Sequence, residues 1–200
     1  METGVIHTGG TNIATEVETM QAAVITAPGQ VEIATVPIPE PGMGEVRVKL
    51  EGCGLCASNI PVWEGREWFS YPVAAGNPGH EGWGYIDALG AGVAGIKVGE
   101  RVAFLSNNAY AQYDIAKADE IVVLPDFLNG KPFPGEPLGC AMNIFSRSDI
   151  RRGQTIAIVG AGFLGAILIQ LAKSAGATVI AISQREFSLE TAKKTVQTIL

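Results

Sequence analysis

The stretch Thr155-Ile156-Ala157-Ile158-Val159-Gly160-Ala161-Gly162-Phe163-Leu164-Gly165 decides the fold class of the second half of the chain. Its first five residues are an apolar run that predicts a buried strand, and residues 163–175 predict a helix that ends at Gly176. Residues 178–182 predict a second strand, and Ser188 is the expected N-cap of a further helix toward the C-terminus. Strand, helix, strand and helix in this order predict the opening of a parallel sheet.

The three glycines of this stretch have the spacing Gly-x-Gly-x-x-Gly. The first permits a tight turn, the second allows the backbone to approach a pyrophosphate, and the third allows helix and strand to pack closely. Because the run follows a strand and opens a helix, it has the context of a dinucleotide-binding turn, with a purely structural turn as the alternative. The predicted cofactor contacts here are Gly160, Gly162, Phe163, Leu164 and Gly165.

The residues after the second predicted strand indicate which dinucleotide is bound. Sites for NAD usually place a carboxylate there, which bonds the ribose 2′-hydroxyl. This chain has Ser183, Gln184 and Arg185 instead, so no carboxylate repels a 2′-phosphate and Arg185 can pair with one. The sequence therefore predicts NADP(H) over NAD(H), unless Arg185 is only a solvated surface charge.

Short β-type runs broken by turn residues fill the chain before Pro125. Apolar and charged residues alternate cleanly in residues 45–50, which is typical of a strand with one buried face. This part predicts a compact barrel or sandwich, and residues 140–148 predict a helix. The expected fold class is therefore mixed α/β. The other expected strands are residues 22–26, 31–36, 84–89, 101–105 and 120–124.

The composition limits the partners of the chain. With 47% hydrophobic and 17% charged residues over 200 positions, it has the apolar content of a globular protein. A net charge of −6 and the lack of a Lys/Arg-rich run argue against nucleic acid as a partner. The longest apolar run, residues 156–169, is shorter than the roughly 20 residues of a membrane helix. We expect neither nucleic acid nor membrane as a partner.

The cysteines and the N-terminus indicate the compartment. Cys53, Cys56 and Cys140 are too few for a disulfide scaffold and favour a reducing compartment, although Cys53-x-x-Cys56 leaves a redox pair as an alternative. Residues 1–20 lack the basic start and the apolar stretch of a secretory signal, and we expect them to be a flexible extension. The predicted location is the cytoplasm.

Four side chains supply the donor types of a catalytic zinc site, namely a thiolate, an imidazole and two carboxylates. They are Cys56, His80, Glu81 and Glu136. Since they come from separated segments, spacing alone favours an ordinary core cysteine and a histidine in a turn.

Several ordered motifs favour the zinc interpretation, because together they resemble the zinc-containing alcohol and polyol dehydrogenases of the medium-chain dehydrogenase/reductase superfamily. The resemblance runs from about residue 20 to residue 200. It implies a GroES-like β-barrel domain over residues 21–150 and the start of a Rossmann domain, truncated, over residues 151–200. The motifs are Gly54-Leu55-Cys56-Ala57-Ser58-Asn59, Gly79-His80-Glu81-Gly82-Trp83-Gly84, Val98-Gly99-Glu100-Arg101-Val102, Tyr110-Ala111-Gln112-Tyr113, Glu136-Pro137-Leu138 and the glycine turn.

The resemblance also implies roles for the ligands. Cys56 and His80 match the first two zinc ligands, and Glu81 matches a conditional ligand that exchanges with water in some members. For the third ligand we expect Glu136, as in the polyol branch, over Cys140, which alcohol dehydrogenases would favour. Cys140 is then a small thiol near the nicotinamide. A single catalytic zinc follows, because the chain lacks the cysteines of the structural zinc lobe found in many relatives.

The implied activity is hydride transfer between a small-molecule alcohol or carbonyl substrate and the nicotinamide. The expected catalytic residues are Cys56, His80, Glu81 and Ser58, which matches the first proton-relay residue. Two positions depart from the family: Pro61 replaces a relay histidine, and Asn59 replaces the aspartate that orients the zinc histidine.

Other interpretations remain open at this stage. A zinc-free quinone or enoyl reductase of the same superfamily, or a non-catalytic nucleotide-binding fragment, also fits the glycine turn.

The third-ligand position suggests a secondary alcohol or polyol as substrate, and we expect the full-length protein to be a homo-oligomer. Five aromatic residues form either a substrate pocket or ordinary barrel core: Trp63, Trp68, Phe69, Tyr71 and Trp83.

Overall fold

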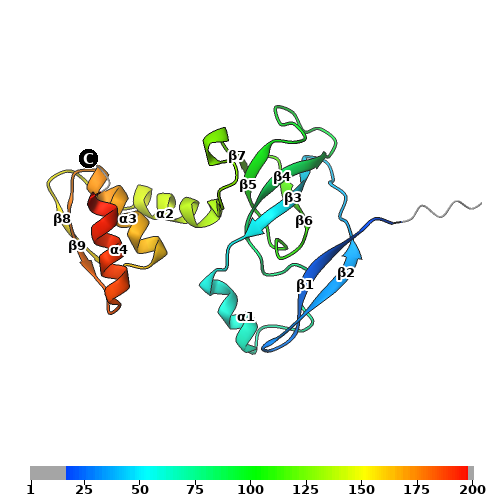
Figure 1. Cartoon of the computed structure of the whole chain (residues 1–200), viewed down its shortest axis with the longest axis horizontal. Helices are drawn as coiled ribbons and strands as arrows, with labels where there is room; N and C mark the ends of the chain where they lie inside the picture. Colours follow the sequence, from blue (N-terminus) through cyan, green and yellow to red (C-terminus); the bar gives the residue numbers. More distant parts are fainter. Residues whose placement is uncertain (1–16, 198–200) are drawn as a thin grey trace, which may run out of the picture.

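The computed structural model describes residues 17–197, and it opens with a β-hairpin (Figure 1). Strands β1 (Thr19–Ala27) and β2 (Gln30–Pro37) pair in antiparallel fashion. Gly29 turns the chain between them with φ of 67°, a conformation that glycine adopts without strain. Strand β1 begins three residues before the expected residue 22, and residues 1–16 of the predicted extension lie outside the described residues.

A curled five-stranded antiparallel sheet forms the centre of the first unit, in the order β6-β3-β4-β5-β7. Its buried face carries a closely packed apolar core, because alternate residues of each strand point inward. The strands are β3 (Glu45–Cys53), β4 (Glu81–Leu89), β5 (Arg101–Leu105), β6 (Tyr113–Lys117) and β7 (Ile121–Val123). The core residues are Val46, Val48, Ile86, Val102, Phe104 and Ala116.

Residues 110–112 connect the hairpin to this sheet through backbone hydrogen bonds. Ala23 N donates to Tyr110 O at 2.8 Å, and Gln112 N donates to Gln21 O at 3.1 Å. Leu50 N of β3 donates in turn to Gln112 O at 2.9 Å. The segment therefore joins two β layers, which agrees with the predicted barrel-like β unit.

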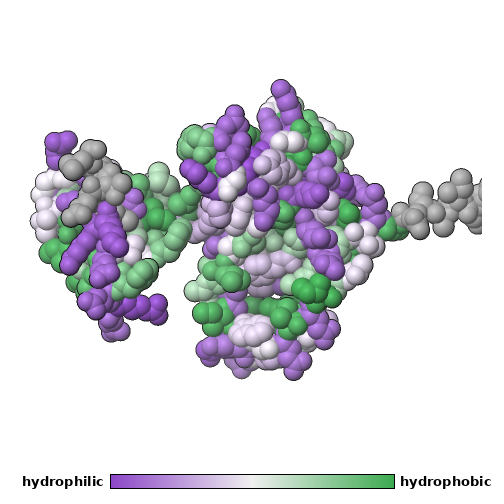
Figure 2. Space-filling view, viewed as in Figure 1, coloured by the Kyte–Doolittle hydropathy of each residue, from purple (hydrophilic) through white to green (hydrophobic). Residues whose placement is uncertain are grey.

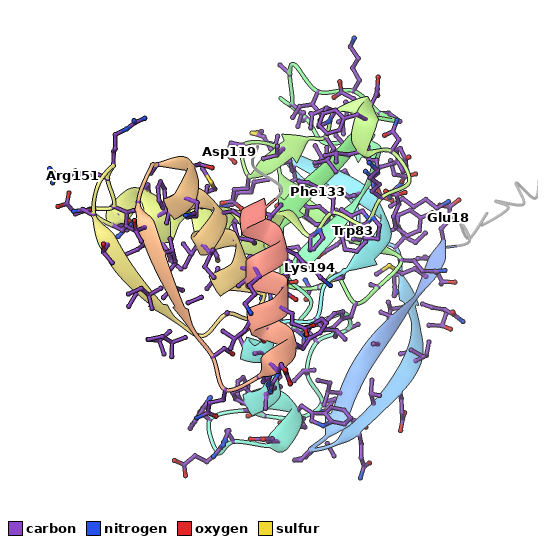
Figure 3. All side chains as sticks on the ribbon, turned by 60° about the vertical axis from the view of Figure 1, so that its left-hand side comes forward. Glu18, Trp83, Asp119, Phe133, Arg151 and Lys194 are labelled. Atoms are coloured by element: carbon purple, nitrogen blue, oxygen red, sulfur yellow. The ribbon has the colours of Figure 1, made fainter. Side chains whose placement is uncertain are left out.

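Helix α2 (Gly135–Arg147) leads from the sheet to a second unit. There, β8 (Thr155–Val159) and β9 (Thr178–Ile182) pair in parallel, with α3 (Phe163–Ser174) as the crossover and α4 (Glu186–Gln197) after them. The two units meet at α2, and an open cleft separates them beside it (Figure 2). Arg151 lies at the outer end of the second unit, away from Trp83 and Phe133 of the first (Figure 3).

The predicted mixed α/β class is confirmed, while several element boundaries were wrong. Helix α2 begins at Gly135, before the expected residue 140. Ser188 is not a cap: α4 begins at Glu186, and Ser188 is a buried residue of its first turn whose N–H donates to Arg185 O at 3.1 Å. The short helix α1 (Ile60–Glu64) and strand β6 were not predicted. None of the helices among residues 17–197 has the length and apolar character needed to cross a bilayer.

Arg101 fixes the segment that leads into α2. Its side chain is 3% exposed and pairs through Nε with Glu51 at 2.5 Å. Its Nη1 donates to Leu128 O at 2.8 Å, and its Nη2 donates to Lys131 O at 2.7 Å. Because these carbonyls precede α2, the buried guanidinium sets where that helix leaves the sheet.

We expect Arg101→Met to lower the free energy of unfolding by about 3 kcal/mol, because it leaves a carboxylate and two carbonyls without their donor. Urea unfolding measures the change. Arg66→Met is the matched control, since Arg66 pairs with Glu64 at the surface, with side chains 58% and 48% exposed, and should cost less than about 0.5 kcal/mol. Equal losses in the two variants would contradict the role given to Arg101.

Candidate active site

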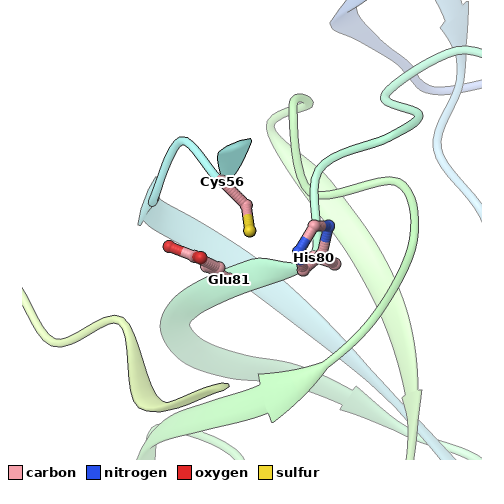
Figure 4. Close-up of side chains that lie close together, drawn as sticks. All are labelled: Cys56, His80 and Glu81. Atoms are coloured by element: carbon pink, nitrogen blue, oxygen red, sulfur yellow. The ribbon is translucent and has the colours of Figure 1, made fainter. Parts of the chain in front are cut away.

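Three potential metal ligands meet where β3 ends and β4 begins. Cys56 follows β3 by three residues, and His80 and Glu81 stand at the start of β4. The ligand atoms of the three residues all lie within 4.8 Å of one another (Figure 4). Strand pairing brings them together, because Cys53 opposes Gly82 and Gly54 N donates to Glu81 O at 3.0 Å.

Gly54 provides the space for the Glu81 carboxylate. A Cβ at position 54 would lie 1.9 Å from Glu81 Oε2 and 3.0 Å from Glu81 Cβ. Glu81 itself is only 7% exposed. A buried carboxylate therefore lies against a bare backbone and beside a thiol and an imidazole, which is an unusual arrangement unless a cation is shared.

His80 is held in a defined tautomer. Its Nδ1 lies 2.9 Å from the carbonyl oxygen of Pro78, which can only accept a hydrogen bond. Nδ1 is therefore the protonated nitrogen of the neutral ring, and Nε2 keeps its lone pair, as a metal-binding histidine requires. The exposed Ser58 places its Oγ 3.5 Å from that Nε2.

The donor set fits zinc. Ligands at about 2.0–2.3 Å from a tetrahedral ion lie roughly 3.3–3.8 Å from one another. The observed limit of 4.8 Å is about 1 Å wider than this spacing. Thiolate, imidazole and carboxylate are also the ligand types that zinc prefers.

Glu136 and Cys140 lie in the first part of α2, outside the three-residue group. Cys140 Sγ donates to Glu136 Oε1 at 2.9 Å, one helical turn away. This hydrogen bond, together with partial burial and the negative charges of Glu136, Cys56 and Glu81, raises the pKa of the Cys140 thiol to about 11. Both candidates for the third ligand are thus paired with each other on α2, and the structure does not bring either of them into the group of Cys56, His80 and Glu81.

The environment of Cys53 argues against the alternative of a redox pair. Burial raises the pKa of the Cys53 thiol to about 11, with the charges of Glu81 and Asp114 adding to the rise. A redox-active cysteine has a lowered pKa, because the thiolate is the reactive form. Cys53 is also free, like Cys56.

Sequence reasoning gave no individual role to Tyr110, which the structure places in the hydrogen-bond network of the site. Its hydroxyl lies 3.1 Å from Asn59 Oδ1 and 3.3 Å from Gly54 O. Asn59 Oδ1 also accepts from Cys56 N at 3.2 Å, and Asn59 Nδ2 donates to Pro78 O at 2.9 Å. Burial raises the pKa of Tyr110 to about 12, so its hydroxyl is protonated at neutral pH. Only the motif Tyr110-Ala111-Gln112-Tyr113 signalled this segment.

The five aromatic residues do not form one pocket. Trp63 lines a largely apolar cavity of about 470 Å³ beside Cys56. The ring of Trp83 instead covers Gly52, where an added Cβ would lie 2.5 Å from it, and this agrees with a packing role. Trp68 packs on Phe69 with ring centroids 6.1 Å apart, and the hydroxyl of Tyr71 donates to Val62 O.

The glycine turn has the backbone that the sequence predicts. Gly160 has φ of 94°, Gly162 is the N-cap of α3, and a Cβ on Gly165 would lie 1.9 Å from Gly160 O. Phe163 and Leu164 are the first residues of α3. Cys140, which was expected near the nicotinamide, lies on a different helix, α2. A cavity of about 500 Å³ brings the turn together with the end of β9; it is lined by Val159, Gly160, Ala161, Gly162, Ile182, Ser183, Gln184, Arg185 and Ser188.

Comparison with known proteins agrees with this geometry. Residues 42–126 match the family described as alcohol dehydrogenase GroES-like domain. An alcohol dehydrogenase of Geobacillus stearothermophilus is 29% identical, over 88% of this chain and 61% of its own length. A sorbitol dehydrogenase of Halalkalibacterium halodurans is 31% identical, over 83% of this chain and 57% of its own length.

Solved structures are similar over the same extent. A candidate zinc-binding dehydrogenase from Sinorhizobium meliloti 1021, solved with NADP bound, superposes with a TM-score of 0.77 at 26% identity. The match covers 89% of this chain and 60% of that chain. The chain thus spans about 60% of the length of the proteins that it matches.

We expect Gly165→Ala to destabilise the chain by about 2 kcal/mol, because the new methyl group would overlap backbone atoms of the turn. Gly139→Ala is the control: Gly139 is an interior residue of α2 with open space around its Cβ position, so alanine should stabilise by about 0.5–1 kcal/mol. Urea unfolding compares the two. If both variants were equally stable, the close contact of helix and turn would not be needed.

Proposed function

The chain belongs to the medium-chain dehydrogenase/reductase superfamily, and from this premise we propose that it is part of an oxidoreductase that uses zinc and NADP(H). The proposed substrate is a secondary alcohol or a polyol-like molecule. The observation that supports this most directly is the group formed by Cys56, His80 and Glu81, whose ligand atoms lie within 4.8 Å of one another. A zinc-free quinone or enoyl reductase of the same superfamily would not need these three donors together.

The proposed reaction removes a hydride from the alcohol carbon and a proton from its hydroxyl, which yields a carbonyl compound and NADPH. Bound zinc would supply Lewis acidity, which lowers the pKa of a coordinated hydroxyl group. Cys56, His80 and Glu136 would hold the ion, with Glu81 as a ligand that can leave. The glycine turn, from Gly160 to Gly165, would hold the pyrophosphate at the N-terminus of α3.

Ser58 is the proposed first acceptor of the substrate proton. It is exposed on the 3-10 turn that follows Cys56, and its Oγ faces Nε2 of His80 at 3.5 Å. Pro61 occupies the first turn of α1, where proline favours the start of a helix but has no side chain that can carry a proton. We therefore propose that the proton passes from Ser58 to solvent.

The first experiment measures zinc per chain by elemental mass spectrometry on protein purified without chelator. We expect about one equivalent of zinc per chain, since the proposal contains a single open catalytic site.

Glu136→Gln should weaken zinc binding by more than about tenfold in chelator competition, whereas Cys140→Ala should change it less than about threefold.

Two results would contradict the proposal in different ways. Folded protein without zinc would favour the zinc-free reductase or a non-catalytic fragment. A larger loss in Cys140→Ala than in Glu136→Gln would keep the zinc site but make Cys140 its third ligand.

A second prediction concerns the dinucleotide. Arg185→Glu should weaken the binding of NADPH by about tenfold or more and leave that of NADH nearly unchanged, because only NADPH carries the 2′-phosphate that Arg185 would pair with. Fluorescence titration of the whole chain with each dinucleotide measures this. Arg152→Glu makes the same charge change before β8, at the end of the strand opposite to the glycine turn, and should affect neither. Equal losses for both dinucleotides would remove the basis for NADP(H) preference.

A further inference from the structure

Two separate loops must be held at a fixed distance for Cys56 and His80 to share a ligand. The Cys56 loop follows β3, and the His80 loop precedes β4. Asn59 links them directly: its Oδ1 accepts from Cys56 N at 3.2 Å, while its Nδ2 donates to Pro78 O at 2.9 Å. Pro78 O also receives the hydrogen bond of His80 Nδ1 at 2.9 Å.

The orientation of the Asn59 amide therefore decides the arrangement. A carboxylate has two equivalent oxygens, but an amide has one acceptor and one donor end. If the amide of Asn59 flipped, its NH₂ group would face Cys56 N and its oxygen would face the carbonyl of Pro78. Both contacts would then be repulsive, and the link between the loops would be lost.

Tyr110 supplies the second hydrogen bond that specifies this orientation. Its hydroxyl reaches Asn59 Oδ1 at 3.1 Å, so the amide oxygen receives two donors on the same side. The backbone of Tyr110 is fixed independently, since its N–H donates to Gly76 O at 3.0 Å and its carbonyl accepts from Ala23 N at 2.8 Å. Gly79 packs directly on it, because a Cβ at position 79 would lie 2.5 Å from Tyr110 N.

We propose that Tyr110 is a positioning residue of the metal site, which acts through Asn59 and the carbonyl of Pro78 to hold Cys56 and His80 in register for one ion. This inference rests on the zinc site proposed above. Tyr110 touches neither metal nor substrate in this role. Its hydroxyl replaces, with a neutral hydrogen bond, the negative charge that an aspartate at position 59 would supply.

The test removes one hydroxyl. Tyr110→Phe should weaken the binding of Co²⁺, used as a spectroscopic probe, by about tenfold, as is typical for loss of a residue that orients a ligand. Titration in the thiolate-to-cobalt absorption band follows Cys56 directly. Tyr85→Phe is the matched control, since Tyr85 is an exposed residue of β4 and should change the affinity less than twofold.

A double-mutant cycle identifies the route. In an Asn59→Ala background, Tyr110→Phe should have no further effect on Co²⁺ affinity, because the link between the two is already lost. A tenfold effect that persists in this background would overturn the route through Asn59 and favour the contact with Gly54 O. Urea unfolding of the metal-free variants separates a general loss of stability from a specific loss of Co²⁺ affinity. If Tyr110→Phe leaves the Co²⁺ affinity unchanged, the proposal is overturned, whether or not the variant is less stable than the wild type.

A second readout does not depend on metal. The chain has two histidines, so the ¹⁵N chemical shifts of His80 can be resolved from those of His7. The wild type should hold His80 as the Nδ1–H tautomer, and Tyr110→Phe should lower its population. If the wild type binds no Co²⁺, the proposed function fails, while a tautomer shift in Tyr110→Phe still supports the role of Tyr110. If the wild type binds no Co²⁺ and the tautomer is also unchanged in Tyr110→Phe, that role is overturned.

Discussion

The site depends on the register of β3 against β4. Antiparallel pairing up to Cys53 and Gly82 brings the residues that follow β3 beside those at the start of β4. A slip of one residue would turn the Glu81 side chain to the other face of the sheet. The hydrophobic core of the sheet resists such a slip, because Ile86 of β4 would leave its place beside Val46 and Val48 of β3. Packing in the centres of β3 and β4 thus fixes the positions of the side chains at their ends.

Glycine is concentrated at this pairing for a steric reason. A Cβ at Gly84 would lie 2.1 Å from the carbonyl oxygen of Lys49, and one at Gly82 would lie 2.8 Å from the ring of Phe104. Gly54 leaves room for the Glu81 carboxylate in the same way. Larger residues at these positions would separate the strands and move the ligands apart. Glycine at these three positions is therefore a condition for bringing Cys56, His80 and Glu81 within reach of one ion.

Local patterns in the sequence predicted what depends on local contacts. Strands β5, β8 and β9 occur at the residues expected, because each is a short apolar run bounded by turn residues. The expected burial of residues 155–159 was wrong: no residue of β8 or β9 is buried, and exposed residues alternate with half-buried ones. Ser188 was misassigned because a capping residue and a buried serine in a first turn look alike until the partner of the backbone N–H is known. The role of Tyr110 depends on a contact with Asn59, 51 residues away, and periodicity carries no information about such a contact.

The hydrogen bond between Glu136 and Cys140 competes with the proposed role of Glu136 as the third zinc ligand. Its net contribution to stability is about 1 kcal/mol, as for most hydrogen bonds in proteins. With Glu136 as the proposed third ligand, this weak hydrogen bond is the one that would break when the ion binds. Helix α2 contacts both the sheet and α3, so the proposed third ligand and the proposed dinucleotide turn are carried by neighbouring helices.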